Sequence, residues 1–362
     1  STPIAGPGVI AQVVRWMLRG DSPFYLRPSY APKLIGWGLN FRRYCNKEAT
    51  HKGFEALAAL SRESLGLLEE LSQTLDFYYE RKGLLHIYLT KKGFDEAKIE
   101  RDTFKARGFE SRLLNREEAI GLEPALSDRI LGGLLIEGEA HGHSYGYVRA
   151  VADELEKLGV TLLENRAVSR ILVEKGQARG AVLSSPEEEI TADLVVLAAG
   201  SWTSFLAKTV GLSVPLQPAK GYSCTIDTYP GAPSIPLLMP EARVIVTPLQ
   251  NRIRFGGTLE LAGFDLSLNE TRYQAVIRGA RAVLRHPFEM KNEESWCGLR
   301  PCLPDGLPII DRVSHIDGLI MAAGHAMLGF TQSPATGKIV AEIANGETPS
   351  VPIEAFRFKR FE

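Results

Sequence analysis

The stretch Gly-His-Ala-Met-Leu-Gly-Phe-Thr-Gln-Ser-Pro-Ala-Thr-Gly occupies residues 324–337 and directly follows the apolar run Leu319–Ala323. An apolar strand, a glycine-containing loop and the start of a helix, in this order, predict an anion-binding site. The first N–H groups of a helix lack partners within the helix and lie at the positive end of its dipole. We expect the helix to include Ile339–Ile343 and to hold residues 333–337 in its first turn, where Pro334 is tolerated.

A second apolar run, Leu194–Ala199, ends at Gly200, Ser201 and Trp202. Its continuous apolarity predicts a strand covered on both faces, and the small residues at its end would let a ligand approach the backbone closely. This signal is weak by itself, because many strands in α/β proteins end in Ala-Gly. An ordinary structural strand therefore remains the alternative interpretation.

A third segment, Trp296–Pro308, places Arg300 between turn-forming residues. A guanidinium held rigidly in this way can bind a carboxylate through two parallel hydrogen bonds. A single arginine is more often a partner in a surface ion pair, so this interpretation depends on the other two segments.

Hydrophobic periodicity predicts a chain of mixed α and β structure. Helical spacing of leucines runs through Phe54–Leu71, and Val148, Val151, Leu155 and Leu158 lie on one face of a second helix. The expected strands are Gly83–Leu89, Val160–Leu163, Val168–Val173, Ala178–Leu183, Arg243–Val246 and Arg252–Gly256.

The bulk composition indicates a folded protein whose ligands are small molecules. Of the 362 residues, 44% are apolar, and 42 basic residues nearly balance 43 acidic ones, so no global field attracts nucleic acid. Cys45, Cys224, Cys297 and Cys302 are scattered, which argues against zinc or redox pairs. His141 and His143 have no acidic or cysteine neighbours at ligand spacing, so we predict no metal site.

Together, these segments resemble the FAD-dependent D-amino-acid oxidase superfamily, in particular its bacterial D-amino-acid dehydrogenase small-subunit and glycine oxidase branch. Ser1–Gly8 is similar to the segment after that family's first flavin-contacting loop, and Pro218–Cys224 is similar to the crossover into the substrate sheet. Residues 296–308 and 324–337 resemble the two C-terminal signatures. A helix N-terminus suits this cofactor, because a reduced flavin carries negative charge at its N1 and C2 carbonyl.

The resemblance implies an α/β (α+β overall) fold with a Rossmann-like FAD-binding domain and a mixed-sheet substrate-binding domain. The FAD-binding domain would comprise residues 1–75, 139–219 and 295–362. The substrate-binding domain would comprise residues 76–138 and 220–294.

The resemblance also assigns roles to individual residues. Arg300 would bind the substrate carboxylate, with Tyr222 and His143 beside the substrate, and Arg300 and Tyr222 are the expected catalytic residues. The residues expected to contact FAD are Ala167, Val168, Ala199, Gly200, Trp202, Gly324, Gly329, Phe330 and Thr331. No cysteine stands where some sarcosine oxidases attach flavin covalently, so non-covalent FAD is expected.

One departure from the family pattern concerns the cofactor. The family begins with a strand, a G-x-G-x-x-G turn and a helix, and this sequence shows no such segment. We therefore expect an incomplete FAD-binding domain, poor FAD binding, and a slot beside Leu194–Ala199 or an open apolar face near Gly324–Gly329. The alternative function is a non-catalytic remnant or subunit that serves as a scaffold.

The implied reaction is oxidation of the CH–NH bond of a D-amino acid, glycine or a secondary amine to an imine, by hydride transfer to flavin. The electron acceptor would be oxygen or a quinone. A cytoplasmic location is expected, since no signal peptide or apolar span is recognised. Val13–Leu18 and Leu34–Phe41, flanked by arginines, suggest a peripheral contact with the inner face of the membrane, although buried helices are the preferred interpretation. The oligomeric state is not predicted.

Overall fold

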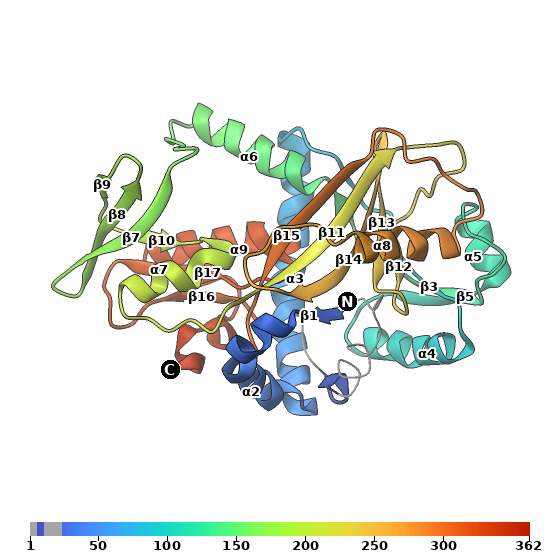
Figure 1. Cartoon of the computed structure of the whole chain (residues 1–362), viewed down its shortest axis with the longest axis horizontal. Coiled ribbons are helices and arrows are strands. Elements are labelled where there is room, and N and C mark those ends of the chain that lie inside the picture. Colours follow the sequence, from blue (N-terminus) through green and yellow to red (C-terminus); the bar gives the residue numbers. More distant parts are fainter. Residues whose placement is uncertain (1–5, 11–23) are drawn as a thin grey trace.

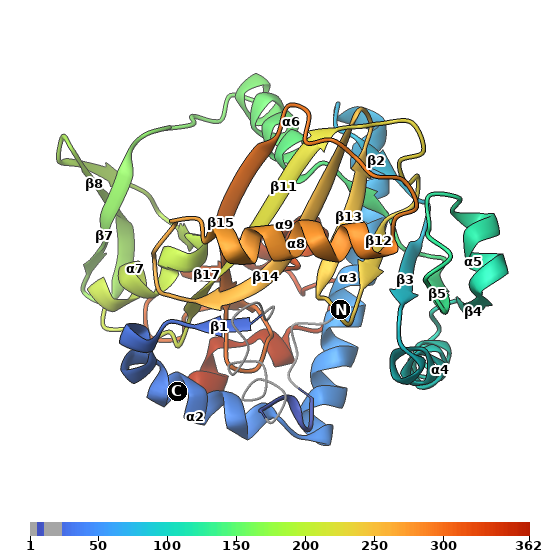
Figure 2. The same ribbon diagram turned by 45° about the vertical axis from the view of Figure 1, so that its right-hand side comes forward.

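The computed structural model describes residues 6–10 and 24–362. Its helices pack around one large sheet and several small ones (Figures 1 and 2). The α-helices are α2 (Ile35–Tyr44), α3 (Lys47–Thr74), α4 (Lys91–Lys105), α5 (Arg116–Leu122), α6 (Ser144–Lys157), α7 (Thr203–Thr209), α8 (Glu270–Val283) and α9 (Gly329–Ala344). Short 3-10 helices are η1 (Pro28–Leu34), η2 (Gly200–Trp202), η3 (Glu354–Phe356) and η4 (Phe358–Phe361).

The largest sheet runs in the order β15-β11-β14-β13-β12-β3-β5-β4, and β1 pairs with β14. Its strands are β1 (Phe24–Leu26), β3 (Leu84–Tyr88), β4 (Ser111–Asn115), β5 (Gly132–Ile136), β11 (Gln217–Asp227), β12 (Leu237–Met239), β13 (Val244–Leu249), β14 (Arg252–Leu261) and β15 (Glu294–Cys302). Most neighbours are antiparallel, but β1–β14 and β12–β3 are parallel, so the sheet is mixed as expected.

The remaining strands form smaller sheets. One has the order β10-β17-β16, with β10 (Val195–Leu197) parallel to β17 (Leu319–Ala323) and β16 (Ile309–Arg312) antiparallel to it. The others consist of β7 (Ala167–Glu174), β8 (Gln177–Ser184) and β9 (Glu188–Thr191), and of β2 (Tyr79–Glu80) paired with β6 (His141–Gly142). Figure 1 shows β7, β8 and β9 at one end of the molecule, and α5 with β3 and β5 at the other. The expected mixed α/β fold class is confirmed.

The helix α8 covers one face of the large sheet (Figure 2). Asn269 caps its N-terminus by accepting from the Arg272 N–H at 3.2 Å. Its buried positions include Tyr273, Val276 and Ala280, at the spacing of a helical stripe. These side chains pack with Cys224, Val246 and Phe255 of the sheet in the main apolar core, so this part of the sheet is buried.

The helix α3 begins at the cap Asn46, whose side chain accepts from the Ala49 N–H at 2.9 Å. Its buried residues, including Leu57, Leu60 and Leu68, form the predicted leucine stripe. A hydrogen bond from Gln332 Nε2 to Ser61 Oγ at 3.1 Å links it to α9. Helix α3 therefore supports the helix whose N-terminus belongs to the candidate site.

Two strand predictions need correction. Residues 160–163 form no strand, and Val160 and Leu163 are exposed; none of the strands that the structure describes pairs with this apolar run. In β10, Leu197 is buried but Val196 is 40% exposed, so the predicted cover on both faces is not found there. The other expected strands are present within a few residues of their predicted ends.

The strand β10 lies directly against β17, so the structure has no slot between these two strands. On its other side, no strand is paired with β10 in the part of the chain that the structure describes. The exposed Val196 and Met327 are apolar surface in this region.

The start of α9 also differs from the prediction. The helix begins at Gly329 rather than at Ser333, so Pro334 lies inside it. Proline cannot donate to the carbonyl four residues earlier, that of Phe330. The Ser333 hydroxyl donates to this carbonyl at 3.0 Å, which satisfies the acceptor and lets the helix start one turn earlier.

The predicted division into two domains stays a prediction. The strands β11 and β15 extend across the expected boundaries at 219/220 and 294/295, and β1, which falls in the predicted FAD-binding domain, pairs with β14. Within the described ranges, no helix has both the length and the apolar character that crossing a membrane requires.

Candidate active site

Arg300 lies on the face of the large sheet that is opposite to α8. The register pairs Ala219 with Arg300 and Gly221 with Gly298, and side chains alternate between the faces of a strand. A Cβ placed on Gly221 would lie 2.1 Å from Arg300 Nη2. The guanidinium therefore lies directly over the backbone of Gly221, in space that only glycine leaves free.

The guanidinium is fixed by a backbone carbonyl. Arg300 Nη1 donates to the Thr258 carbonyl of β14 at 2.9 Å, reaching across the intervening β11. Thr258 has a φ of 66°, which is uncommon for a β-branched residue and indicates a strongly constrained backbone. This carbonyl is a neutral acceptor, so the positive charge of Arg300 is oriented without being neutralised.

The electrostatic setting of Arg300 favours an anionic ligand. Burial lowers the pKa of its guanidinium, which reflects the cost of keeping a charge away from water. Among the described residues, no carboxylate comes within ion-pair distance of it. A partly buried arginine with no carboxylate partner can bind a ligand carboxylate with two hydrogen bonds.

The loop before α9 lies against the end of β15. The Pro301 carbonyl accepts from the Ala326 N–H at 3.0 Å, and Cys302 forms a β-bridge with His325. Gly324 has a φ of 93°, and a Cβ there would meet Leu303 at 2.2 Å. The two segments that the sequence singled out therefore meet, as expected. That Arg300 faces Thr331 across a cleft stays a prediction.

The N-terminus of α9 is open. Leu328 precedes the helix without a side-chain cap, and a Cβ on Gly329 would meet no atom within 4 Å. The first N–H groups of a helix need external partners. Gly329, Phe330 and Thr331 thus present donors and the positive end of the helix dipole to a ligand.

His143 lies near the first turn of α9. Its neighbour Gly142 packs against the Phe330 ring, and Phe330 stacks edge-on with Tyr147 at 5.4 Å. His143 Nδ1 accepts from the Gly146 N–H at 3.2 Å, capping α6. Burial first, and then the nearby Arg254, lower the pKa of His143, so the neutral ring keeps its proton on Nε2.

Tyr222 lies on the other face of the sheet from Arg300, because it pairs with Cys297, an odd number of residues from Arg300 along β15. It is 2% exposed, belongs to the core beneath α8, and donates through its hydroxyl to Glu260 Oε2 at 2.6 Å. The structure therefore does not bring Tyr222 and Arg300 together at one surface, and a direct contact with substrate is not supported. The two side chains point to opposite faces because side chains alternate along β11 and β15, and the resemblance did not show to which face each one points.

The residues predicted to contact the rest of the cofactor lie in two places, at the start of β7 and directly after β10. Ala167 and Val168 begin β7 and are exposed. Ala199 follows β10, and Gly200 has a φ of 52° with open space around its Cβ position. Trp202 is half-exposed and packs against Phe264 at 5.6 Å. Ser201 Oγ donates to the Leu299 carbonyl at 3.2 Å, which connects this loop to the strand of Arg300.

Sequence reasoning missed two contributors to the site. Thr258 contributes its backbone carbonyl, and the identity of a side chain does not indicate a role for the backbone of the same residue. Arg254, on β14, donates to Thr225 Oγ1 at 3.3 Å, and burial lowers the pKa of its guanidinium. A charged residue inside the otherwise apolar run Ile253–Phe255 was the signal available for it.

Cys302 lies near Arg300, His325 forms a β-bridge with Cys302, and both side chains are uncharged. Burial lowers the pKa of His325 to about 4, and its Nε2 lies 2.9 Å from Thr336 Oγ1. Burial raises the pKa of the Cys302 thiol to about 11. Around the site and elsewhere in the described residues, no group of three His, Cys, Asp or Glu side chains is arranged to hold a metal ion.

Comparison with known proteins places this geometry in a family. The sequence pattern of the family described as "FAD dependent oxidoreductase" matches residues 21–343. The chain belongs to this family.

Relatives of this FAD-dependent oxidoreductase support the assignment. A "D-amino acid dehydrogenase" of Xanthobacter autotrophicus is 33% identical over 358 residues, which are 97% of this chain and 85% of the relative. A second protein of that name, from Bradyrhizobium diazoefficiens, is 30% identical over 100% of this chain and 87% of its own length. The glycine oxidase structure from Geobacillus kaustophilus has a TM-score of 0.77 and 25% identity, covering 84% of this chain and 83% of that one.

The described residues fit the cofactor of this family. Added Cβ atoms at Gly200 and Gly329 would meet nothing, so both backbones can be approached closely by a flat ring or a phosphate. Gln332 Oε1 and Thr203 Oγ1 are buried without a hydrogen-bond partner in the described chain. These two polar atoms lie just inside the helices that follow the open glycines, where a bound ligand can satisfy them.

Proposed function

We propose that this protein oxidises the CH–NH bond of a D-amino acid, glycine or a secondary amine to the imine. Bound FAD supplies the chemistry by accepting a hydride from the substrate. The observation that carries this proposal is Arg300, a partly buried cation without a carboxylate partner in the described chain, next to the loop that leads into α9. The names of the relatives support the same substrate class.

In this proposal Arg300 binds the substrate carboxylate, and Gly329, Phe330 and Thr331 donate to the flavin pyrimidine from the N-terminus of α9. Gly324 allows the chain to turn there, and His143 lies beside the substrate as a neutral hydrogen-bond donor. Ala167 and Val168 approach the adenine with their backbone, and Ala199, Gly200 and Trp202 line the dinucleotide. The amine enters neutral, so positioning contributes more than acid–base groups.

We further propose that FAD is held without a covalent bond. Attachment through a cysteine needs a reactive thiolate. Burial raises the pKa of all four thiols, those of Cys45, Cys224, Cys297 and Cys302. Their protonated state at neutral pH disfavours such a bond.

The exposed surface of helix α2 supports a peripheral contact with the cytoplasmic face of a membrane. A protein at that surface can pass electrons to a quinone in the membrane, so we propose a membrane quinone as the electron acceptor. Ile35 and Leu39 lie one turn apart and are 64% and 59% exposed. Arg42 and Arg43, in the last turn, are exposed as well. An apolar stripe bordered by basic residues is typical of helices at an anionic lipid surface. Val13–Leu18, the other predicted segment, lies outside the described residues.

Substitution of Arg300 tests the proposal. In the FAD-loaded protein, Arg300→Gln should raise the KM for D-alanine by 30-fold or more, since a buried charge-assisted pair contributes about 2 to 5 kcal/mol. D-alaninamide, which lacks the carboxylate, should show little change. Arg278→Gln, on the exposed side of α8, is the matched control. Activity is followed by dye reduction and, separately, by oxygen consumption. An unchanged KM for D-alanine would exclude the carboxylate role.

A further inference from the structure

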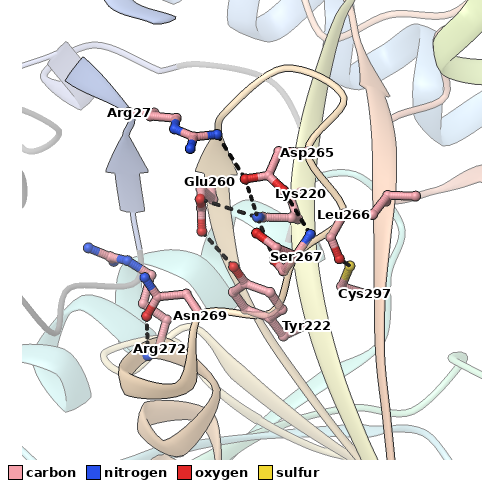
Figure 3. Close-up of polar contacts among 10 residues, drawn as sticks. All are labelled: Arg27, Lys220, Tyr222, Glu260, Asp265, Leu266, Ser267, Asn269, Arg272 and Cys297. Atoms are coloured by element: carbon pink, nitrogen blue, oxygen red, sulfur yellow. Dashed lines mark hydrogen bonds and ion pairs between the residues drawn. The ribbon is translucent and has the colours of Figure 1, made fainter. Parts of the chain in front are cut away.

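The face of the sheet opposite to Arg300 carries a set of buried charged and polar residues that the proposed reaction does not use. Figure 3 shows their contacts with one another. Lys220, Tyr222 and Glu260 are 1%, 2% and 4% exposed. Burying charges costs several kcal/mol per ion unless they are paired and hydrogen-bonded. A set of this kind therefore calls for a reason beyond simple packing.

The three side chains satisfy one another. Glu260 Oε2 accepts from the Tyr222 hydroxyl at 2.6 Å, and Glu260 Oε1 lies 3.4 Å from Lys220 Nζ. Lys220 Nζ also donates to the Ser267 carbonyl at 2.8 Å and lies over the Tyr222 ring. Burial and the Glu260 carboxylate raise the pKa of Tyr222, so it remains a hydrogen-bond donor. We call these three residues the rear triad.

A second carboxylate completes the charge balance. Asp265 lies 3.8 Å from Lys220 Nζ and accepts from Arg27 Nη1 at 2.8 Å. Arg27 follows β1, whose residues pair with β14 at Leu259–Leu261. The rear triad is thus connected to β1, which pairs with β14 beyond Gly257, the last residue of β14 that pairs with β13.

The rear triad spans an irregularity in the sheet. Lys220 pairs with Glu260, but Tyr222 pairs with Gly257, so Thr258 and Leu259 of β14 together oppose Gly221 of β11. Two residues against one constitute a β-bulge, which leaves part of the ladder unpaired and bends the strand. Thr258, with its φ of 66°, lies in this bulge.

The bulge is the feature that orients Arg300 on the opposite face. It turns the Thr258 carbonyl toward Arg300 Nη1, and the guanidinium lies over Gly221. The residues on either side of the bulge are those of the rear triad. A change in Tyr222 or Glu260 therefore alters the bulge, and through it the position of the guanidinium.

We propose that Lys220, Tyr222 and Glu260 are positioning residues that hold the bulge at Thr258 and thereby set the guanidinium of Arg300 for the substrate carboxylate. This inference rests on the proposed function, in which Arg300 binds that carboxylate. It assigns Tyr222 an indirect role in place of contact with substrate. Removal of one member weakens carboxylate binding and leaves the chemical step nearly unchanged.

Tyr222→Phe removes the hydroxyl and keeps the ring, so it is the first variant to test. Tyr273→Phe is the matched control, because Tyr273, on the inner face of α8, is equally buried and also donates to a glutamate, Glu293, away from the bulge. Two readouts are used on the FAD-loaded protein. One is the dissociation constant of propionate, a non-reacting carboxylate, by calorimetry, and the other is the KM and kcat for D-alanine and D-alaninamide.

We expect Tyr222→Phe to raise the propionate dissociation constant and the KM for D-alanine about ten-fold. The kcat should stay within about two-fold, and the KM for D-alaninamide should not change. Glu260→Ala should act in the same direction, and Glu260→Gln should recover most of the loss, since its amide oxygen still accepts from Tyr222. Tyr273→Phe should lower the melting temperature without changing propionate binding.

The outcomes separate this inference from the proposed function. If Arg300→Gln weakens propionate binding but Tyr222→Phe does not, the positioning role is wrong and the carboxylate role of Arg300 stands. If Arg300→Gln has no effect, the carboxylate role is wrong and the positioning role falls with it. An equal rise of KM for D-alanine and D-alaninamide in Tyr222→Phe would show a general loss of structure and also overturn the inference.

Discussion

At the scale of single residues, Gly221 shows how the backbone of one strand leaves space for a side chain of the neighbouring strand. It is the residue of β11 that opposes the bulge, and its missing side chain leaves room for the Arg300 guanidinium. Its φ is not in the left-handed region, so the requirement for glycine arises from space. At the neighbouring Thr258 the backbone conformation itself is unusual, and the backbone carbonyl accepts the hydrogen bond from Arg300.

We predict that Gly221→Ala displaces Arg300 while the protein remains folded. The added Cβ would lie 2.1–2.3 Å from the guanidinium, which is the movable end of a flexible side chain, so the arginine moves and the strand does not. The KM for D-alanine should rise at least ten-fold. Gly256→Ala, on the same face, is the control, because its Cβ would lie 3.3 Å from a methyl of Ile245. Equal KM values for the two variants would contradict the steric argument.

At the scale of elements, α9 and α2 show opposite relations to their surroundings. Helix α9 is embedded against α3, and its interior proline is accommodated by the Ser333 hydroxyl, so its N-terminus is held rigidly for a ligand. Helix α2 contains no fully buried residue, although Trp37 and Phe41 stack at 5.2 Å on its inner side. Its outer side therefore retains exposed Ile35 and Leu39.

We predict that α2 binds anionic lipid. The protein should cosediment with vesicles containing phosphatidylserine, and Ile35→Ser with Leu39→Ser should reduce the bound fraction several-fold, because the buried apolar area is lost. Added salt should weaken binding through Arg42 and Arg43. Ile99→Ser, an exposed apolar residue on α4, is the control. Binding that is unchanged by the double substitution would exclude α2 as the lipid contact.

At the scale of the whole molecule, uncharged histidines lie inside the folded protein. Burial lowers the pKa of His325 to about 4, and burial also lowers those of His141 and His143. In the unfolded chain a histidine has a pKa of about 6.5. Below that pH the unfolded state binds more protons, so the free energy of unfolding decreases as the pH falls from 6.5 toward 4.

We predict that His325→Gln reduces this acid sensitivity. The histidine accounts for a loss of at most about 2 kcal/mol between neutral pH and pH 5, from the two pKa values. Glutamine does not titrate and can still hydrogen-bond to Thr336. Urea unfolding of the protein at pH 7.5 and pH 5 should show a smaller difference for the variant than for the wild type. The same difference in both would mean that His325 is not neutral in the folded state.

The family, the mixed fold, and the segments around Arg300 and Gly329 could be predicted from the amino-acid sequence, because glycine, proline and apolar runs act locally and leave a recognisable pattern. The sequence also placed most strands, since periodicity follows from which face of an element is buried. It misplaced the start of α9, because the Ser333 bond that accommodates Pro334 is a detail of local geometry. It predicted a strand at residues 160–163, where no strand of the described residues pairs with the chain.

The face of the sheet that each residue of β11 occupies is seen only in the tertiary structure. The separation of Tyr222 from Arg300 could therefore not be predicted from the sequence. A bulge shifts the pairing by one residue, and neither the bulge nor its Thr258 carbonyl has a side-chain signature. The rear triad could likewise not be predicted from the sequence, because Lys220 and Glu260 are 40 positions apart and are brought together by strand pairing. Local residue types therefore specify the elements, and long-range pairing specifies how the site is oriented.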